Sequence, residues 1–508
     1  MAMFRMIWRQ RSAVLLVGGI VILLHTTDLG SHLLPYTKLL QSKRSIEVIN
    51  QPLLQMFFQQ IEKNTQPDPW YVTDFSLTEP NWKTSKWNES QSSYILREHD
   101  GWLDMWQQIS NQLLVYSAYW DNRNWVQDAP VVRIFASSIR KSGWPDELVP
   151  ELLTAKCLMR YGRNELGNIV VRIVNATYAK LTKENWSELG YEFKCKDPLG
   201  GNESPSDVAL RTNKSGESQQ HMWIKVHHFR ASVTQTLDKP TIGLCAKPLS
   251  SDLSKIPNVA WQIADFIAYY KVLGVSKFTF YDDGAPTAVK RIIYDLSHEG
   301  VHVQLLPWNV NWKEIRLAWG IYPDNFVTSA QDCFYRNMYK QDYTLVVGVD
   351  QFVVPRTNSS LRNMIVDLSR AVDDYFADFR FANALFCTNY PSKTVQELPF
   401  PLLSQQKVYR RQISDGYRGA QYMGRTEAVE WAGINAVGKR KILTPVKWVA
   451  KNVAFVHQYA ASQPPSFQCG DFNEDQSGGF VVEDTQIPVV YGPNVTNLIR
   501  QWKKYLNS

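Results

Sequence analysis

The sequence predicts two folded domains: an α/β domain with a mostly parallel, three-layer sheet, preceded by a smaller β-sandwich-like accessory domain. The chain has 508 residues, which is more than one ordinary domain holds. Short β-rich runs separated by turn residues fill residues 113–229, and from Thr241 onward strand-like and helix-like segments alternate. With 44% hydrophobic residues the chain has enough apolar side chains for two cores.

The first 30 residues predict a cytoplasmic tail and a membrane anchor. Arg5, Arg9 and Arg11 precede an apolar run from Ala13 to Leu24, and no Lys or Arg follows until Lys38. This asymmetry keeps the N-terminus cytoplasmic and sends the rest of the chain into the lumen. No small-x-small cleavage site follows the run, so an uncleaved signal-anchor is favoured over a cleaved signal peptide.

Residues 31–110 are interpreted as a stem, because they lack strand alternation and are polar and Trp-rich toward the end. The six cysteines form no Cys-x-x-Cys pair, which argues against zinc, and in an oxidising lumen some of them should pair. The connectivity is left open, with Cys157 and Cys195 nearest in sequence. Asn-x-Ser/Thr sequons, typical of a lumenal glycoprotein, begin at Asn88, Asn175, Asn185, Asn202, Asn213, Asn358 and Asn494.

Residues 111–235 predict the β-rich accessory domain, since β-branched and aromatic runs alternate there with Pro, Gly, Asn and Asp loops. Aromatic residues make up 13% of the chain, a load found in sugar-binding proteins but also in large cores. The net charge is +7, yet no long basic block or basic helix stripe occurs. Nucleic acid is therefore not an expected partner.

Residues 236–508 predict the parallel α/β domain. Strand-like segments at 241–249, 277–284, 301–308 and 344–350 alternate with helix-like segments at 257–274, 287–300 and 328–341. Ligands of such sheets bind beyond the carboxyl ends of the strands. The side chains expected at those ends are Lys247, Tyr281, Asp282, Asp283 and Asp350.

Asp350 is the candidate metal ligand, because it directly follows a buried strand-like run. No Gly-x-Gly-x-x-Gly, Walker or Gly-x-Ser-x-Gly motif supports dinucleotide, ATP or serine-hydrolase chemistry. Manganese and magnesium are hard ions that take oxygen ligands, and diphosphate oxygens with waters fill most of their positions. One carboxylate then suffices, although a capped edge or a solvated turn explains a lone Asp equally well.

Five segments in register resemble glycosyltransferase family 92. They are "YSAYWDNR" followed by "VVRIFA", "CAKPL" leading to "FIAYYKVLGVSKFTFYDD", "DCFYRN", "VDQFVVP" and "VAFVHQY". The resemblance implies a GT-A fold and an inverting galactosyltransferase of the Golgi, anchored as a type II membrane protein. It implies UDP-galactose as donor, Mn²⁺ or Mg²⁺ as cofactor, a terminal galactose or fucose of a glycoprotein N-glycan as acceptor, and a β1,4 link.

The metal motif departs from the family pattern at two positions. Gly348 stands where the family has its first Asp, and Gln351 stands where it has Glu. The retained Asp350 matches the second Asp, which the resemblance gives as the metal ligand. The two losses motivate an alternative, a catalytically inactive, lectin-like relative that binds glycans.

The same resemblance gives His457 as a second metal ligand, against the alternative of a hydrogen-bonded core histidine. Arg440 and Lys441 are candidates for screening the diphosphate charge, or else belong to a solvated turn.

Inverting transfer also requires a base for the acceptor proton. Glu430 is selected for that role, with Glu427, Asp471 and Glu474 as rivals. Trp431 beside it is read as core packing or a sugar platform.

Overall fold

The structure is a computed structural model that describes residues 7–9, 12–17, 20–25, 106–110, 113–138, 152–163, 169–181, 190–212, 223–229, 239–308, 326–370, 376–393, 395, 400–413, 421–433, 435–460, 469, 472 and 481–506. The chain divides into two compact units, Met1–Pro69 and Trp70–Ser508. Most of the predicted stem, residues 31–105, lies outside the described part.

The described residues of the first unit form an antiparallel sheet of β1 (Ile7–Arg9), β2 (Ser12–Val17) and β3 (Ile20–His25). The predicted anchor falls on β2 and β3, so this run is drawn as strands and not as a helix. Val17 pairs with Ile20 at one end of the β2–β3 ladder. Among the described residues, no helix has the length and apolarity needed to span a bilayer. The anchor stays a prediction.

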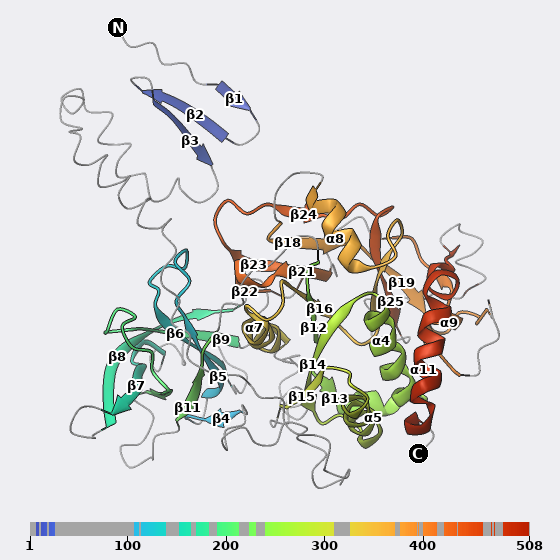
Figure 1. The fold of residues 1–508 in the computed structure, drawn as a ribbon, viewed down its shortest axis with the longest axis horizontal. Coiled ribbons are helices and arrows are strands. Elements are labelled where there is room, and N and C mark those ends of the chain that lie inside the picture. The colour runs from blue at the N-terminus through green and yellow to red at the C-terminus, as the bar shows by residue number, and fades with distance from the viewer. Residues whose placement is uncertain are drawn as a thin grey trace. The chain divides into compact units, whose positions relative to one another are not determined.

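The accessory domain is a closed barrel, and the predicted sandwich is wrong. Its strands are β4 (Gln107–Gln108), β5 (Leu113–Asp121), β6 (Val131–Ser138), β7 (Lys156–Arg163), β8 (Ile169–Lys180), β9 (Gly190–Lys196), β10 (Asp207–Arg211) and β11 (Ile224–His227). They follow the order β11-β10-β7-β8-β9-β6-β5-β4, and β11 pairs again with β5 in parallel. This second pairing closes a ring from β5 to β11, and β4 pairs with β5 outside that ring (Figure 1).

The physical reason for one barrel instead of two sheets lies in the long strand β8. Its first part, Ile169–Asn175, pairs with β7, and its second part, Ala176–Lys180, pairs with β9. One strand thus carries the sheet around a corner, and closure leaves fewer exposed strand edges than a sandwich does. The Cys157–Cys195 disulfide joins β7 to β9 within this domain.

The α/β domain contains a mixed sheet in the order β13-β14-β12-β16-β21-β18-β24, with β15 beside β14. The strands β12, β13, β14, β15 and β16 run parallel as predicted, but β21 runs antiparallel to β16 and to β18. Their bounds are β12 (Ile242–Ala246), β13 (Leu249–Ser250), β14 (Val275–Asp283), β15 (Val303–Pro307), β16 (Tyr343–Val347), β18 (Asp378–Phe381), β21 (Gln421–Arg425) and β24 (Val446–Trp448).

In parallel α/β sheets a reversal of strand order forms a crevice, and the order of this sheet reverses next to β12. The chain runs from β12 outward to β14 and β15 on one side, then returns to place β16 on the other side. Such a reversal separates the loops that follow two neighbouring parallel strands, and ligands bind there. The loops in question follow β12 and β16.

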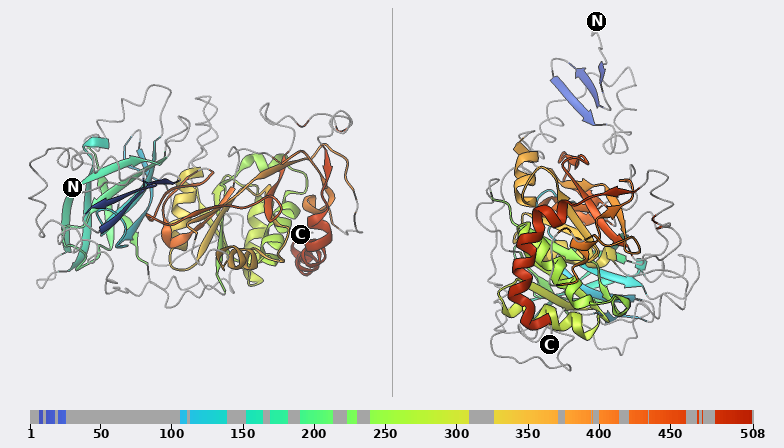
Figure 2. Two further views of the ribbon diagram at one scale, coloured as in Figure 1. Left: turned by 90° about the horizontal axis from the view of Figure 1, so that it is seen from above. Right: turned by 90° about the vertical axis from the view of Figure 1, so that its right-hand side faces the viewer.

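Helices lie on both faces of this mixed sheet. On one face lie α4 (Val259–Val272), α5 (Thr287–His298) and α11 (Gly492–Leu506), and on the other lies α7 (Phe326–Asn337) (Figures 1 and 2). Strand alternation sets the two faces: Leu244 of β12 packs in the core under α4, whereas its neighbour Cys245 packs in the core under α7.

A second sheet holds the segment that follows the candidate metal residue. It has the order β17-β25-β19-β20-β26, in which β17 is antiparallel to β25. The bounds are β17 (Gln351–Pro355), β19 (Asn383–Cys387), β20 (Tyr409–Arg410), β25 (Ala454–Ala460) and β26 (Val482–Glu483). The hairpin β22 (Val429–Ala432) and β23 (Val437–Arg440), with the helices α8 (Leu361–Arg370) and α9 (Leu403–Gln406), completes the domain.

Helix α7 joins the barrel to the α/β domain. The buried carboxylate of Asp332 accepts hydrogen bonds from Ser117 Oγ and Tyr119 Oη of β5, both at 2.6 Å, and from Tyr281 Oη of β14 at 2.7 Å. Arg336 pairs with the same carboxylate at 2.6 Å. One side chain therefore ties three elements together, which explains why the barrel and the α/β domain fall in one compact unit.

Candidate active site

The crevice brings Lys247 and Asp350 together. Lys247 is the first residue after β12, and its backbone N–H donates to Val347 O, the last residue of β16, at 3.0 Å. The chain then turns, closed by a 3.0 Å hydrogen bond from Gln351 N–H to Gly348 O. The turn places Asp350 close enough to Lys247 for the ammonium to act on its carboxyl. The strand ends thus present one cation and one carboxylate, as the sequence predicts.

The ionisation of Asp350 reflects a balance of opposing effects. Burial raises the pKa of the Asp350 carboxyl, while the Lys247 ammonium and hydrogen bonds from the backbone and the Gln458 side chain lower it. The result is a carboxyl that holds its proton more firmly than a free aspartic acid. A cationic ligand or a rise in pH would favour the charged form.

Gly348 and Gln351 form one structural feature with Asp350. A Cβ at position 348 would lie 2.5 Å from Asp350 Oδ1, so the carboxylate occupies the space that a side chain would need. The Gln351 side chain accepts a hydrogen bond from the Gly348 N–H through Oε1, at 2.6 Å. The turn therefore carries one carboxylate, that of Asp350, and the Gln351 amide braces it.

Gln458 is a site residue that the sequence reasoning missed. The register pairs Gln351 with Gln458 and Phe352 with His457 across β17 and β25. Because side chains alternate along a strand, Gln458 shares the face of Gln351 and reaches Asp350, whereas His457 takes the other face. Asn383 of β19 donates to Gln458 Oε1 and so orients the amide. The sequence did place Gln458 directly after His457, the residue that was selected as a metal ligand.

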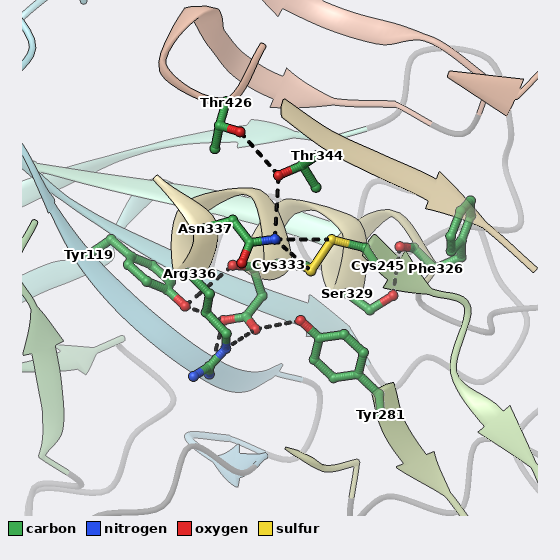
Figure 3. Close-up of a disulfide and its surroundings, with 11 residues drawn as sticks. Tyr119, Cys245, Tyr281, Phe326, Ser329, Cys333, Arg336, Asn337, Thr344 and Thr426 are labelled. Carbon is green, nitrogen blue, oxygen red and sulfur yellow. Dashed lines mark hydrogen bonds and ion pairs between the residues drawn. A yellow bond between two sulfur atoms is a disulfide. The ribbon is translucent and has the colours of Figure 1, made fainter. Parts of the chain in front are cut away.

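The Cys245–Cys333 disulfide fixes the strand that carries Lys247. It joins β12 to α7, and Asn337 Nδ2 lies 3.9 Å from Cys245 Sγ and 3.7 Å from Cys333 Sγ (Figure 3). The same amide lies 3.3 Å from Thr344 Oγ1 of β16. Both strands that border the crevice are therefore attached to one helix.

Residues 241–480 match the sequence profile of glycosyltransferase family 92. This segment belongs to that family. The match spans the crevice, from the start of β12 through Asp350 and Gln458. A search of the curated proteins gives no match to the chain. Membership implies a transferase that takes a sugar donor and a glycan acceptor, and the donor, acceptor and linkage are treated below.

His457 of the family 92 domain is not placed beside Asp350. Its Nε2 lies 2.8 Å from Arg356 Nη2 and 3.8 Å from Asp484 Oδ2, and its ring stacks on Phe386 at 4.1 Å between centroids. Burial lowers the pKa of His457 well below its ordinary value, against the attraction of Asp484. Two arginines, Arg356 and Arg410, also act on the ring, which is an unfavourable place for a metal cation.

The metal prediction is supported by the chemistry of Asp350 alone. Among the described residues, no three His, Cys, Asp or Glu side chains gather in a way that could hold a metal ion. A hard cation would find one carboxylate in the crevice and would take its remaining oxygens from a diphosphate and from water. Asp350 suits that role, and the metal-ligand assignments of Asp350 and His457 both stay predictions.

The three residues at the end of β14 have different surroundings. Tyr281 is buried and donates to Asp332, on the α7 side of the sheet. Asp282 pairs with Lys290 of α5 at 2.7 Å and accepts from the Ala285 N–H, and burial raises its pKa against the pull of Lys290. Asp283 pairs in register with Ser250 of β13. Tyr281 and Asp282 therefore serve the fold.

Arg440 and Lys441 lie on an exposed turn between β23 and β24. Arg440 Nε donates to Thr444 O at 3.1 Å, and the Lys441 N–H donates to Ala428 O at 2.8 Å. These contacts close the turn and involve no residue of the crevice. The solvated-turn alternative describes both residues better than the diphosphate role does.

Glu430, the predicted base, is buried among cations. Arg133 and Lys194 of the barrel lie 3.0 and 3.1 Å from Oε1, and Lys439 lies 2.9 Å from Oε2. Burial alone would raise the pKa of Glu430, but these three cations lower it to about 2. A carboxylate that stays ionised and paired is a poor proton acceptor, so the geometry argues against the predicted role.

The neighbours of Glu430 are engaged as well. Trp431 donates its indole N–H to Glu192 of the barrel at 2.7 Å, which favours packing over a sugar platform. Glu427 pairs with Arg425. Asp471 and Glu474 lie outside the described residues. The sequence missed the role of Glu430 because its partners are about 240 and 300 residues away along the chain.

Proposed function

We propose that the family 92 domain transfers galactose from UDP-galactose to a terminal galactose or fucose of a glycoprotein N-glycan, with inversion and a β1,4 link. The observation that carries the proposal is the position of Lys247 and Asp350 at the strand-order reversal, where the Lys247 charge acts on the Asp350 carboxyl, inside the segment matched to the family. The donor, acceptor and linkage rest on the resemblance described above.

The crevice residues divide the work of holding the donor. Lys247 supplies a positive charge toward the diphosphate, and its backbone is fixed by Val347. Asp350, oriented by Gln458, would hold Mn²⁺ or Mg²⁺. When bound, the ion would offset the negative charge that builds up as the nucleoside diphosphate departs. Since the carboxyl must be ionised to bind a cation, donor binding should strengthen as the pH rises through its elevated pKa.

Radiolabelled galactose transfer from UDP-galactose with Mn²⁺ tests the proposal, with Asp350→Asn and Lys247→Ala as variants. A loss of 100-fold or more in kcat/KM is expected for Asp350→Asn, in line with removal of a metal ligand. Asp282→Asn is a control of the same chemistry outside the crevice, and its transfer rate should change far less once its stability is matched. Equal turnover of Asp350→Asn and the unaltered protein would remove the assigned role.

A glycan-binding relative without turnover is the second candidate, favoured by Gly348 and Gln351, which leave the turn with a single carboxylate. An array of N-glycans separates the two functions. Retained glycan binding with no transfer from any UDP-sugar would support the lectin, whereas transfer from another UDP-sugar would keep the enzyme and change the donor.

The N-terminal charge pattern motivates a location for this activity. We infer a single-pass type II protein of the Golgi membrane with the family 92 domain in the lumen, based on the arginines that precede the apolar run. Protease protection in sealed microsomes tests the orientation. Digestion of the family 92 domain without detergent would contradict it.

A further inference from the structure

Strand β8 carries two neighbouring apolar side chains on the outer face of the barrel. Val170, Val174 and Ala176 pack toward the inner core, as the alternation of a strand requires. The residues between them face outward, and of these Val171 is 43% exposed and Ile173 is 63% exposed. A strand face in contact with water ordinarily carries polar side chains, so a cover for these two groups is expected.

The same outer face continues into a glycosylation sequence. Asn175, Ala176 and Thr177 form an Asn-x-Thr sequon, and the side chains of Asn175 and Thr177 are exposed. Asn175 follows Ile173 by two residues, a distance of about 7 Å along a strand. Both side chains therefore leave the barrel in the same direction. A group attached to Asn175 Nδ2 would lie next to Ile173 and Val171.

The described sequons differ in what the folded chain leaves accessible. Asn358 Nδ2 donates to Asp367 Oδ2 at 2.6 Å, so the atom that a glycan would occupy is already engaged. Asn175 lies instead on an open strand face, opposite the exposed Lys156 of β7. Asn202 and Asn494 are exposed as well and serve below as internal references.

We propose that Asn175 carries an N-linked oligosaccharide whose first sugars cover Val171 and Ile173. A pyranose ring presents C–H groups on its face and hydroxyls around its edge, so the face packs on apolar side chains while the edge meets water. Two side chains are too few for a stable protein interface, which buries about 800 Å² on each partner. The proposal rests on the lumenal location inferred above and not on the transfer of galactose by the family 92 domain.

The attachment is a group transfer without a change in oxidation state. The co-reactant is an oligosaccharide joined to a lipid pyrophosphate, supplied with its own transferase in the lumen. The C–N bond forms between Asn175 Nδ2 and the anomeric carbon, and the bond from that carbon to the pyrophosphate oxygen breaks. The lipid pyrophosphate leaves, and the amide nitrogen gives up one proton. Asn175 is the substrate of this step, and the chain supplies no catalyst for it.

Peptide mass spectrometry of the full chain, made in cells that glycosylate secretory proteins, tests the attachment. An amidase that converts glycosylated Asn into Asp, used in water enriched in heavy oxygen, marks each occupied sequon. The mark is expected at Asn175, retained in Thr177→Ser and lost in Thr177→Ala, because only the first variant keeps a sequon. Marks at Asn202 or Asn494 in the same digest report that the chain has entered the lumen.

Hydroxyl-radical footprinting tests the cover, because oxidation of an aliphatic side chain follows its exposure to water. Removal of the glycan from the folded chain should raise the oxidation of Ile173 toward that of Ile442, since the two are 63% and 74% exposed in the bare fold. Val171 should follow Ile173. The rise is expected in Thr177→Ala without the amidase, and not in Thr177→Ser. Leu113, which is 0% exposed, keeps its low rate only in an intact fold.

Three results would overturn the proposal. An unmarked Asn175 in a digest that marks another sequon would remove this site and leave the lumenal location standing. A digest without a mark at any sequon would remove both the site and the location. A marked Asn175 with equal oxidation of Ile173 before and after glycan removal would show that the sugars point away from the strand. None of these results depends on whether the family 92 domain transfers galactose.

Discussion

At the scale of single residues, Gly348 controls the position of the Asp350 carboxylate. An alanine Cβ would lie 2.5 Å from Asp350 Oδ1 and would push the carboxylate away from its present place. Gly348→Ala should therefore weaken UDP binding in the presence of Mn²⁺ about tenfold, equivalent to about 1.4 kcal/mol. Titration calorimetry measures this change in the affinity for UDP. Gly438→Ala is the control, because a Cβ there meets its nearest neighbours at an ordinary 3.7 Å, and equal effects of the two variants would contradict the prediction.

Glu430→Gln tests a different residue-scale claim, that this carboxylate stabilises the fold. Removing its charge takes one shared carboxylate away from Arg133, Lys194 and Lys439, so a loss of about 3 kcal/mol in unfolding free energy is expected. The folded pKa of about 2 lies below the ordinary 4.5, so the unfolded chain binds more protons between these values. The stabilisation is present above pH 4.5 and is lost as the pH falls toward 2.

Denaturant melts of Glu430→Gln across pH measure this loss, and the difference from the unaltered protein should shrink below pH 4.5. Glu427→Gln, in the same segment and with 33% side-chain exposure, is the matched control and should change stability little. A general base, in contrast, contributes to turnover and not to the stability of the fold. Lost turnover in a protein of unchanged stability would restore the catalytic role of Glu430.

At the scale of elements, a single carboxyl links α4 to α9. Asp265 accepts from the Ser404 hydroxyl at 2.8 Å and from the Ser404 N–H at 3.1 Å. Burial raises the pKa of Asp265 from 3.8 to about 7, despite both hydrogen bonds. The folded state thus binds more protons than the unfolded state between pH 4 and 7, and its stability falls as the pH rises through that range.

Asp265→Asn should remove this pH dependence while keeping a side-chain acceptor for Ser404. Thermal melts at pH 5 and pH 8 measure this effect. At pH 8 the unfolding free energy of the variant should exceed that of the unaltered protein by at most about 4 kcal/mol. Asp367→Asn, on the exposed side of α8, serves as control. Parallel pH profiles for the Asp265 variant and the unaltered protein would show that this carboxyl does not titrate near neutrality.

The elements that the sequence predicts well are those set by local periodicity. The segments expected at 257–274 and 277–284 appear as α4 and β14, and the parallel order of the first strands follows from their alternation with helices. The strands β18, β21 and β24 were not predicted, because short strands in an antiparallel region depend on distant partners. The closure of the barrel was not predicted for the same reason, since β5 and β11 lie about a hundred residues apart.

The residues of the candidate site also fall into two groups, those that the local sequence predicts and those that depend on distant partners. Lys247 and Asp350 could be predicted, because a parallel sheet brings the carboxyl ends of its strands to one edge. Glu430 and Tyr281 could not be understood from sequence, since their partners Arg133 and Asp332 come from other parts of the chain. His457 and Gln458 differ by one position in the strand register, and only the pairing with β17 distinguishes them.

At the scale of the whole molecule, the barrel and the family 92 domain share a buried ionic interface. Arg123 pairs with Asp121 within the barrel at 2.8 Å and also donates to Glu427 O and Val429 O of the α/β domain at 2.9 and 2.7 Å. Arg133 joins Asp121, Glu192 and Glu430. Buried groups of each domain therefore have partners in the other domain as well as in their own.

A chain shortened to residues 236–508 should therefore be unstable. It would retain Glu430 and Asp332 but lose Arg133, Lys194, Ser117 and Tyr119, which pair with them. Size-exclusion chromatography and thermal melts are expected to show aggregation or a melting temperature at least 10 °C lower. A monomeric fragment that melts with the full chain would show that the barrel is dispensable for the fold.

Because of the shared interface, the barrel is synthesised before the residues that pair with it. The last barrel strand ends at His227, but Glu430, which pairs with Arg133, is made roughly 200 residues later, a delay of roughly 10 to 40 s at ordinary translation rates. Throughout that interval the nascent barrel presents the arginines and aromatic rings that α7 and β22 will later cover. Molecular chaperones that act on nascent chains should therefore bind this protein longest at the barrel, before the family 92 domain has been synthesised.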